Sequence, residues 1–400
     1  MKRPMLRHAL IAGALSIGSA GLVAAQAPPA EFSQAQLPGW SFTPSVSLAG
    51  VFDSNVALAA PKADIGGTQS DRLIMVNPSG ALSFLSPRTV FSGGYRGNLR
   101  RYMDVEGLNG FDQHASVSLR RLATRRLTWF LRDSYAKVAT TDEVEVNGVP
   151  FSRTGSTLNN FSAGLDARLT QLTALSIGYD NTQVSFDRSD AFLTGGYVNA
   201  LRTELSHQMA PRTSLGAEYG VRLANIDEGA REITFHEAGG TLRYQLGKHT
   251  KATVAGGLAY LMDRTFDDKR TGPYVRMGIT HDAARATLGV SFGRSFVPSF
   301  GFGGASQSQQ FRAFIHMPLD RSRAYVQGSA DWRRTNPLVA DGLQLDTYRT
   351  RTTVGYSALR WLRLEGFYDF SRQDSVVTGG EVNRHRVGAQ LVISQPMRIR

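Results

Sequence analysis

The sequence predicts an all-β protein, a single transmembrane antiparallel β-barrel of about eighteen strands, with sixteen as the alternative count. Segments in which apolar and polar residues alternate recur in pairs, separated by short turn-rich joints roughly 34 to 46 residues apart. That spacing indicates a repeated long β-hairpin. Longer loops of Gly, Asp, Asn, Ser and Thr connect the other hairpin ends. Short turns on one side and long loops on the other are typical of outer-membrane barrels.

The chain begins with the pattern of a secretory signal peptide. Lys2, Arg3 and Arg7 precede an uncharged run that ends in small residues near position 25. The run is shorter than the roughly 20 apolar residues that a spanning helix needs, so a cleaved signal is favoured over an anchor. We therefore expect a signal peptide at 1–25, a periplasmic linker at 26–39, the barrel at 40–395 and a C-terminal tail at 396–400.

Composition removes several classes of function. The chain has no Cys, which excludes disulfides, thiolate nucleophiles and thiolate metal sites. Its formal charge is +12, and loss of Lys2, Arg3 and Arg7 with the signal leaves it basic. Basic charge often indicates nucleic-acid binding, but a secretory signal and the lack of a recognition motif argue against nucleic acid as a partner.

The first strands show the alternation most clearly. In 42–52, Phe42, Val46, Leu48 and Phe52 share one parity, which suits lipid, while the other parity is mainly small or polar and suits water. The joints between hairpins are 86–88, 123–125, 170–171, 210–212, 247–249, 282–283, 320–321 and 358–360. The following strands are predicted at 74–84, 91–99, 113–119, 127–135 and 161–169.

The same pattern continues to the end of the chain. Later strands are predicted at 201–205, 215–223, 238–246, 252–262, 275–279, 288–296, 311–319, 324–332, 350–356, 362–370 and 387–393. An even number returns both termini to the periplasm. The barrel must close because hydrocarbon offers no partner for a free strand edge. Asp133 and Arg294 interrupt the outward parity of their strands, and the strands at 113–119, 127–135 and 201–205 are the weakest.

Aromatic residues fall where membrane interfaces are expected. Trp40 and Trp129 would face outward near the periplasmic end, and Tyr260, Trp332, Tyr368 and Phe370 near the outer end, because amphipathic rings favour the interface. A soluble β-sandwich is the alternative, but it would need a second sheet to bury the apolar face. We therefore interpret these residues as membrane girdles.

Two sequence patterns carry a resemblance. The final strand, 386–393, resembles the terminal assembly signal of outer-membrane proteins, although Leu391 replaces the usual aromatic and the chain continues to Arg400. The segments 38–48 and 52–56 resemble the opening of the porin-type barrels called beta-barrel porin 2, with the resemblance covering 38–395. Such families are often found beside exopolysaccharide genes. The resemblance implies an outer-membrane barrel, hints at a transported substrate and implies no catalytic residues.

The water-facing parity carries more arginines than acids. Cross-strand ion pairs account for most of the acids, but unpaired guanidinium groups in a low-dielectric wall would favour anions. Arg349 and Arg351, with Arg333 and Arg363 on flanking strands, form the densest candidate constriction. The predicted pore-lining residues are Arg96, Arg100, Arg243, Arg276, Arg312, Arg333, Arg349, Arg351 and Arg363.

An enzymatic barrel is the rival class. Barrel hydrolases need a His placed with Asp or Ser for general-base or nucleophilic work. The histidines of this chain are scattered singly, without the spacing of a metal site or a nucleophile elbow. We therefore predict no catalytic residue, no metal and no cofactor.

These observations predict a channel in the outer membrane of a Gram-negative bacterium, reached by Sec-type export. It would pass small anions or export an acidic exopolysaccharide; the alternative is a structural or adhesive barrel with a plugged lumen. The long loops at 138–156 and 54–70 would supply the constriction or plug. Expected partners are membrane lipid and lipopolysaccharide, the barrel assembly machinery and polysaccharide export components.

Overall fold

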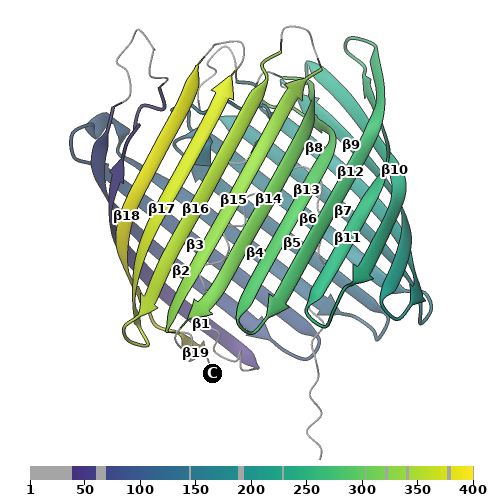
Figure 1. The fold of residues 1–400 in the computed structure, drawn as a ribbon, viewed down its shortest axis with the longest axis horizontal. Helices are drawn as coiled ribbons and strands as arrows, with labels where there is room; N and C mark the ends of the chain where they lie inside the picture. The colour runs from purple at the N-terminus through teal and green to yellow at the C-terminus, as the bar shows by residue number, and fades with distance from the viewer. Residues whose placement is uncertain are drawn as a thin grey trace, which may run out of the picture.

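The computed structural model is a closed antiparallel barrel of eighteen strands, with one further short strand at the C-terminus (Figure 1). It describes residues 38–59, 69–143, 146–187, 193–227, 229–301, 303–319, 323–338, 342–375 and 380–399. Each strand pairs with its neighbours in sequence, and β1 closes the ring by pairing with β18. The predicted fold class and strand count are therefore confirmed. The signal peptide and nearly all of the linker lie outside the described residues.

The strands are long, mostly 13 to 15 residues. Their bounds are β1 Gly39–Asp53, β2 Asp71–Leu85, β3 Thr89–Tyr102, β4 Gly110–Leu122, β5 Leu127–Val138, β6 Ser156–Arg168, β7 Thr173–Phe186, β8 Gly196–Ala210, β9 Thr213–Ile226, β10 Arg231–Gln245, β11 Thr250–Asp263, β12 Asp268–Ala283, β13 Ala286–Pro298, β14 Ala305–Leu319, β15 Ala324–Pro337, β16 Leu345–Ser357, β17 Leu362–Ser375, β18 Glu381–Ser394 and β19 Met397–Ile399. Two short 3-10 turns, η1 Glu106–Leu108 and η2 Thr141–Glu143, lie in the loops.

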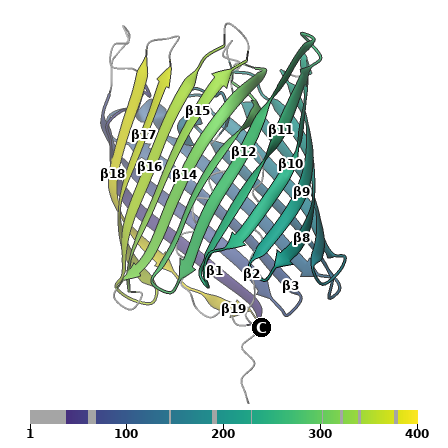
Figure 2. The same ribbon diagram turned by 45° about the vertical axis from the view of Figure 1, so that its right-hand side comes forward.

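The predicted joints form the short turns at one end of the barrel, which is the lower end in Figures 1 and 2. In three of these turns, a Ser or Thr hydroxyl accepts a hydrogen bond from the backbone N–H of the residue three positions later. Ser86 accepts from Thr89, Thr124 from Leu127 and Thr170 from Thr173, at 3.0, 3.1 and 2.9 Å. This side-chain bond favours a tight turn over a continued strand. The joint at 320–321 lies outside the described residues.

The outer surface carries the apolar parity. In β1, Leu48 and Phe52 are exposed, whereas Ala49, Val51 and Asp53 on the opposite parity are buried. Such an exterior fits lipid, since a water-soluble protein rarely exposes an apolar surface of this extent. On the outer face, histidines bond tyrosines of the neighbouring strand. Tyr219 Oη lies 2.8 Å from His236 Nδ1, and Tyr368 Oη lies 2.9 Å from His385 Nδ1.

The last residues continue the closing strand. The pairing of Ser394 with Ser45 and the pairing of Met397 with Phe42 keep one register, so β19 extends β18 along β1. The interruption falls at Pro396, which has no N–H for the ladder, while Gln395 still donates to the Pro44 carbonyl at 3.2 Å. The residues predicted as a tail thus include three that pair with β1.

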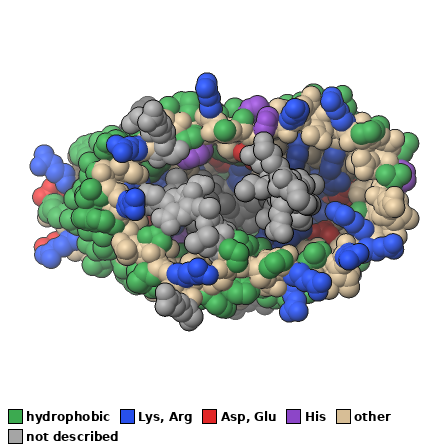
Figure 3. Space-filling model, turned by 90° about the horizontal axis from the view of Figure 1, so that it is seen from below, with side chains coloured by type: hydrophobic (Ala, Val, Ile, Leu, Met, Phe, Trp, Pro, Cys, Tyr) green, Lys and Arg blue, Asp and Glu red, His purple; other side chains and the backbone are tan. Residues whose placement is uncertain are grey.

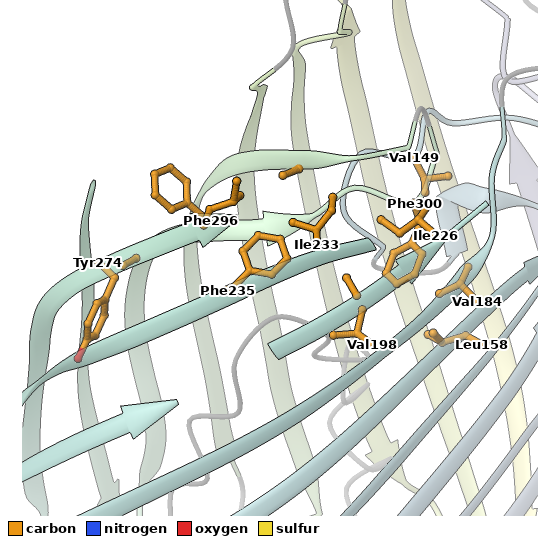
Figure 4. Close-up of a cluster of buried hydrophobic side chains, with 14 residues drawn as sticks. Val149, Leu158, Val184, Val198, Ile226, Ile233, Phe235, Tyr274, Phe296 and Phe300 are labelled. Atoms are coloured by element: carbon orange, nitrogen blue, oxygen red, sulfur yellow. The ribbon is translucent and has the colours of Figure 1, made fainter. Parts of the chain in front are cut away.

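Part of the interior is apolar. A cluster of buried side chains, the lumen cluster, lies inside the upper half of the barrel and extends from β6 to β14 (Figure 4). It includes Ile233, Phe235, Leu261, Tyr274 and Phe296. The upper end of β13 bends into the barrel and lays Phe296 over the inner face of the β10–β12 wall. The lumen of this barrel is therefore partly filled by its own strands and loops.

Among the described residues, no helix is long and apolar enough to cross a membrane.

The outward parity of β11 can be tested at Leu258, which lies near mid-strand with 64% of its surface exposed. Leu258→Arg should cost about 2 to 4 kcal/mol of folding free energy, because arginine at the bilayer midplane loses its hydration. Leu246→Arg, at the turn end of the same hairpin, should cost about 0 to 1 kcal/mol. Urea titration of folding into lipid vesicles measures both variants. Equal costs would contradict the outward assignment or the depth assigned to Leu258.

Candidate functional site: a loop across the lumen

The loop between β5 and β6, residues 139–155, folds into the barrel and is called here the inner loop. It touches the wall at β3 and β18 through its first half, and at β16 and β17 through its second half. It also meets the loop that connects β13 to β14, nearly half the circumference away from β5. The predicted inward fold of this loop is confirmed over its described residues, 139–143 and 146–155. Most of the loop 54–70 lies outside the described residues.

The first half of the inner loop is held by buried ion pairs. Asp142 Oδ2 lies 2.5 Å from Arg384 Nη1, and the same guanidinium binds Asp53 of β1 through Nη2 at 2.5 Å. These three side chains are almost completely buried. Glu143 Oε1 accepts from Arg100 of β3 at 3.2 Å and from Arg386 of β18 at 2.9 Å. The loop carboxylates therefore connect β1, β3 and β18 across the inner surface.

These carboxylates are ionised at neutral pH. Burial by itself would raise the pKa of Asp142, but Arg384 and Arg386 outweigh burial and hold that pKa well below the ordinary value. The pKa of Glu143 is also lowered, because Arg100 and Arg386 oppose the effect of burial in the same way. Two negative charges thus stay on the loop, facing an arginine-rich wall.

The second half of the inner loop docks on the adjoining strands β16 and β17. The Phe151 backbone N–H donates to Gln373 Oε1 of β17 at 2.6 Å, and the Arg349 guanidinium of β16 lies 5.2 Å from the Phe151 ring centre. The Phe300 N–H donates to the Asn147 carbonyl at 3.1 Å. At Gly148 the backbone has a φ of 70°, and a Cβ there would collide with Ser299. Glycine is therefore required where the two loops meet.

Arginines and acids alternate across the wall that faces the inner loop. Arg351, Asp369, Arg386 and Asp53 stand opposite one another on β16, β17, β18 and β1. Arg351 Nε lies 2.5 Å from Asp369 Oδ1. On β14 to β16, Asp331 accepts from Arg312 Nε at 2.9 Å and stands opposite Arg349 in the register. Arg333, on the same strand as Asp331, is also buried. Cross-strand charge pairs of this kind brace the wall as well as setting its potential.

The structure divides the predicted pore-lining arginines into three groups. Arg312, Arg333, Arg349 and Arg351 lie together on β14 to β16, and Arg96 and Arg100 lie on β3. Arg243 and Arg276 lie on another part of the wall, where Arg243 pairs with Glu204, and Arg276 with Glu218 and Glu237. In the view from the turn end, Lys and Arg side chains stand among apolar ones along the rim, and further charged side chains are visible inside the ring (Figure 3).

The prediction that Arg363 belongs to the constriction is wrong. Arg363 is the second residue of β17 and pairs in register with Ser357, so it lies near the turn end. There it forms an ion pair with Glu365, which also accepts from Tyr325 Oη. Arg349 and Arg351 lie farther up the neighbouring strand, because antiparallel strands place early residues of β17 opposite late residues of β16.

Sequence reasoning missed the residues that hold the inner loop. Arg384 shares the parity of Arg386, but the predicted final strand began at 386 and so did not reach Arg384. Asp142 and Glu143 lie in a loop, where alternation gives no direction for a side chain. Asp112, which accepts from Arg100 Nη2 at 2.8 Å, precedes the predicted strand at 113–119. Longer strands in the prediction would have found Arg384 and Asp112.

The described histidines are spread around the barrel, and His114 stands opposite Arg96 on the inner wall. His207, His249 and His281 sit at the turn end, each bonded to a neighbouring hydroxyl or carbonyl. Within the described ranges, no group of three or more His, Asp or Glu side chains has the geometry to hold a metal ion.

Comparison with known proteins finds distant structural similarity alone. No family model and no curated protein matches the chain. Solved structures with a similar fold include OccAB4 of Acinetobacter baumannii, 8% identical over 91% of this chain and 100% of that chain, with a TM-score of 0.44. OpdQ of Pseudomonas aeruginosa is 8% identical over 90% and 98%, with a TM-score of 0.43. The siderophore receptor PirA of Pseudomonas aeruginosa is 12% identical over 90% and 80%, with a TM-score of 0.42. Similarity at this level carries no information on substrate.

The buried ion pairs predict a large effect of Arg384→Gln. This change leaves Asp53 and Asp142 buried without their cation, and breaking such a pair from one side costs about 3 to 5 kcal/mol. Arg264→Gln is the matched control, because the Arg264–Glu232 pair is exposed on both sides and should contribute at most about 1 kcal/mol. Urea unfolding in lipid vesicles compares the two. Similar losses would show that the Arg384 contacts do not stabilise the fold.

The lowered pKa values of Asp142 and Glu143 predict when the inner loop is released. A group with a depressed pKa stabilises the folded form above its ordinary pKa and loses that effect as the pH falls through the depressed value. The loop should stay docked from neutral pH to the ordinary values of 3.8 and 4.5, and detach only below them. Single-channel recordings across this range measure the release as a change in conductance. A transition between pH 5 and 7 would contradict this assignment.

Proposed function

We propose that this chain is a passive channel in the outer membrane of a Gram-negative bacterium, with a preference for small anionic solutes. The closed barrel and its apolar exterior support the location, because these are the features of bacterial outer-membrane barrels. An inner loop that narrows the lumen is a natural place for selection, since solutes must pass it in contact with protein.

The observation that carries the anion preference is the arginine cluster on β14 to β16. Arg312, Arg333 and Arg349 lie around Asp331, beside the point where Phe151 of the inner loop docks. A guanidinium group can bind a carboxylate or phosphate through two parallel hydrogen bonds. Because the surrounding wall has a low dielectric constant, the field of these groups is concentrated in the lumen. An acidic solute would therefore be attracted to this part of the channel.

The inner loop favours small solutes over a polymer. Its contacts with β16, β17 and β18 would have to break before a polysaccharide chain could pass beside it. Export of an acidic exopolysaccharide remains the second use of the proposed channel, and it requires displacement of this loop. The same contacts support the plugged structural barrel as the alternative function.

Selectivity measurements test the proposal. In planar bilayers under a salt gradient, the purified barrel should show a reversal potential of anion-selective sign that shrinks at high salt, where the screening length falls to about 3 Å at 1 M. Arg349→Gln should reduce the selectivity. Arg243→Gln removes the same charge from the wall far from the inner loop, near the turn end, and should reduce it less.

Other outcomes separate the alternatives. Cation selectivity would mean that the acids of the inner loop dominate the constriction, and would contradict the proposal. A barrel without conductance at neutral pH would support the plugged form. Block of the current by an acidic polysaccharide, but not by a neutral one of equal size, would favour the exopolysaccharide as the substrate.

A further inference from the structure

The wall is incomplete at one seam, between β12 and β13. Their pairing runs from the turn up to Val275 and Arg294 and ends there, although β12 continues to Asp268 and β13 to Pro298. Above that rung each strand keeps its other neighbour: β12 pairs with β11 to its upper end, and β13 pairs with β14. Among the described strands, this is the seam at which both partners continue farthest beyond their last shared rung.

The upper part of β13 leaves the wall by bending inward. Phe296 is 6% exposed, and its carbonyl accepts from Arg222 Nη2 of β9 at 2.9 Å. A Cβ on Gly272, which belongs to the inner parity of β12, would lie 2.9 Å from the Phe296 ring. Figure 4 shows Phe296, Phe235 and Tyr274 gathered on the same side of the lumen. The space directly behind the upper part of the seam is therefore filled by apolar side chains of the lumen cluster, and the buried Arg222–Glu237 ion pair borders them.

A free strand edge is costly inside a membrane. Each unsatisfied backbone group in hydrocarbon costs several kcal/mol, which is why barrels close. The height of the seam relieves part of this cost. Thr271 pairs with Tyr260, an outward residue of the aromatic girdle that marks the interface, so 268–270 lie beyond that interface, and 272–274 extend from it into the hydrocarbon. Pro273 lies within this edge, and proline inside a sheet is confined to edges, ends and bulges.

Arg294 occupies the foot of the seam on the lipid-facing parity. Val290 and Phe292 of the same strand share that parity. An arginine on the lipid-facing side of a strand lowers the stability of the barrel. The guanidinium reaches the side-chain amide of Gln307 on β14, whose oxygen can accept from Nη2 at 3.0 Å. Arg294 thus places a positive charge beside the opening between the two strands, on the rung where their pairing ends.

We propose that the β12–β13 seam is a lateral portal for an amphiphile with an anionic head, whose apolar chain passes between the outer leaflet and the lumen cluster. Three observations meet at this seam: the ladder ends, the surface behind it is apolar, and an outward arginine stands at its foot. A purely aqueous pore needs none of them. The inference goes beyond the proposed passage of small anions along the barrel axis.

Thiol labelling tests the portal. Because the chain has no native Cys, only the introduced thiol can react. Ala259→Cys places a thiol inside the barrel opposite Gly272, behind the seam. Ala200→Cys places one on the inner parity of β8, which is paired along both edges. Both sites are buried alanines. In proteoliposomes, a maleimide with a long alkyl chain should label the Ala259→Cys variant at least about tenfold faster than the Ala200→Cys variant, a difference of about 1.4 kcal/mol.

Phe296→Ala should increase the labelling rate of Ala259→Cys further, because this ring lies over Gly272 on the inner side of the seam. Equal labelling of the two alanine sites, or of neither, would overturn the portal. Conductance is recorded on the same preparations. A barrel that conducts no ions but labels selectively behind the seam would retain the portal and reject the axial channel, so the two proposals fail separately.

Competition tests the head group. An alkyl sulfate should protect Ala259→Cys from the alkyl maleimide more strongly than an alkyl trimethylammonium of equal chain length. Arg294→Gln should abolish that difference, because it removes the positive charge at the foot of the seam. Equal protection by both amphiphiles in the native background would overturn the assignment of an anionic head.

Discussion

Every part of this protein depends on satisfying backbone hydrogen bonds where no water is present. Each strand must pair on both edges within the hydrocarbon, so the chain closes β1 on β18 and extends the closure with β19. Proline lies at the places where the pairing of strands is interrupted. Rungs are missing at Pro78 between β2 and β3, the closing strand is interrupted at Pro396, and the free edge of β12 contains Pro273. The first two are local, whereas the third coincides with a strand that leaves the wall.

This constraint explains why the fold could be predicted from the sequence. Because every strand of a closed barrel faces lipid on one side, apolar residues must alternate along it. This alternation is local in sequence and can be recognised without knowing the fold. Strand ends were less accessible: β12 was predicted at 275–279 but spans Asp268–Ala283, because its upper part includes Lys269, Arg270 and Pro273, which weaken the pattern. The two outward charges, Asp133 and Arg294, were visible as exceptions. The register of β12 and β13 shows that one of them, Arg294, lies on the last rung shared by these two strands.

The site could be predicted only in part, because its contacts are distant in sequence. Arg384 bonds Asp142 and Asp53, residues more than 200 positions away, and no periodicity relates them. The excess of lumen arginines suggested an anion pathway, but the inner loop contributes two acids that sequence parity could not assign. The structure therefore reduces the positive excess near β18 and concentrates it on β14 to β16, where Arg312, Arg333 and Arg349 lie around Asp331.

The interior combines two different environments, and each follows from a segment that folds inward. The inner loop brings carboxylates to the arginine wall, so the β1, β3 and β16 to β18 side is charged and hydrogen-bonded. The bent end of β13 brings Phe296 to the β10 to β12 side, where an apolar cluster lies beside the ion pairs of Arg276 with Glu218 and Glu237. The two segments meet where Phe300 donates to Asn147. Movement of either one would therefore disturb the other, which would couple the proposed passage along the axis to the proposed portal in the wall.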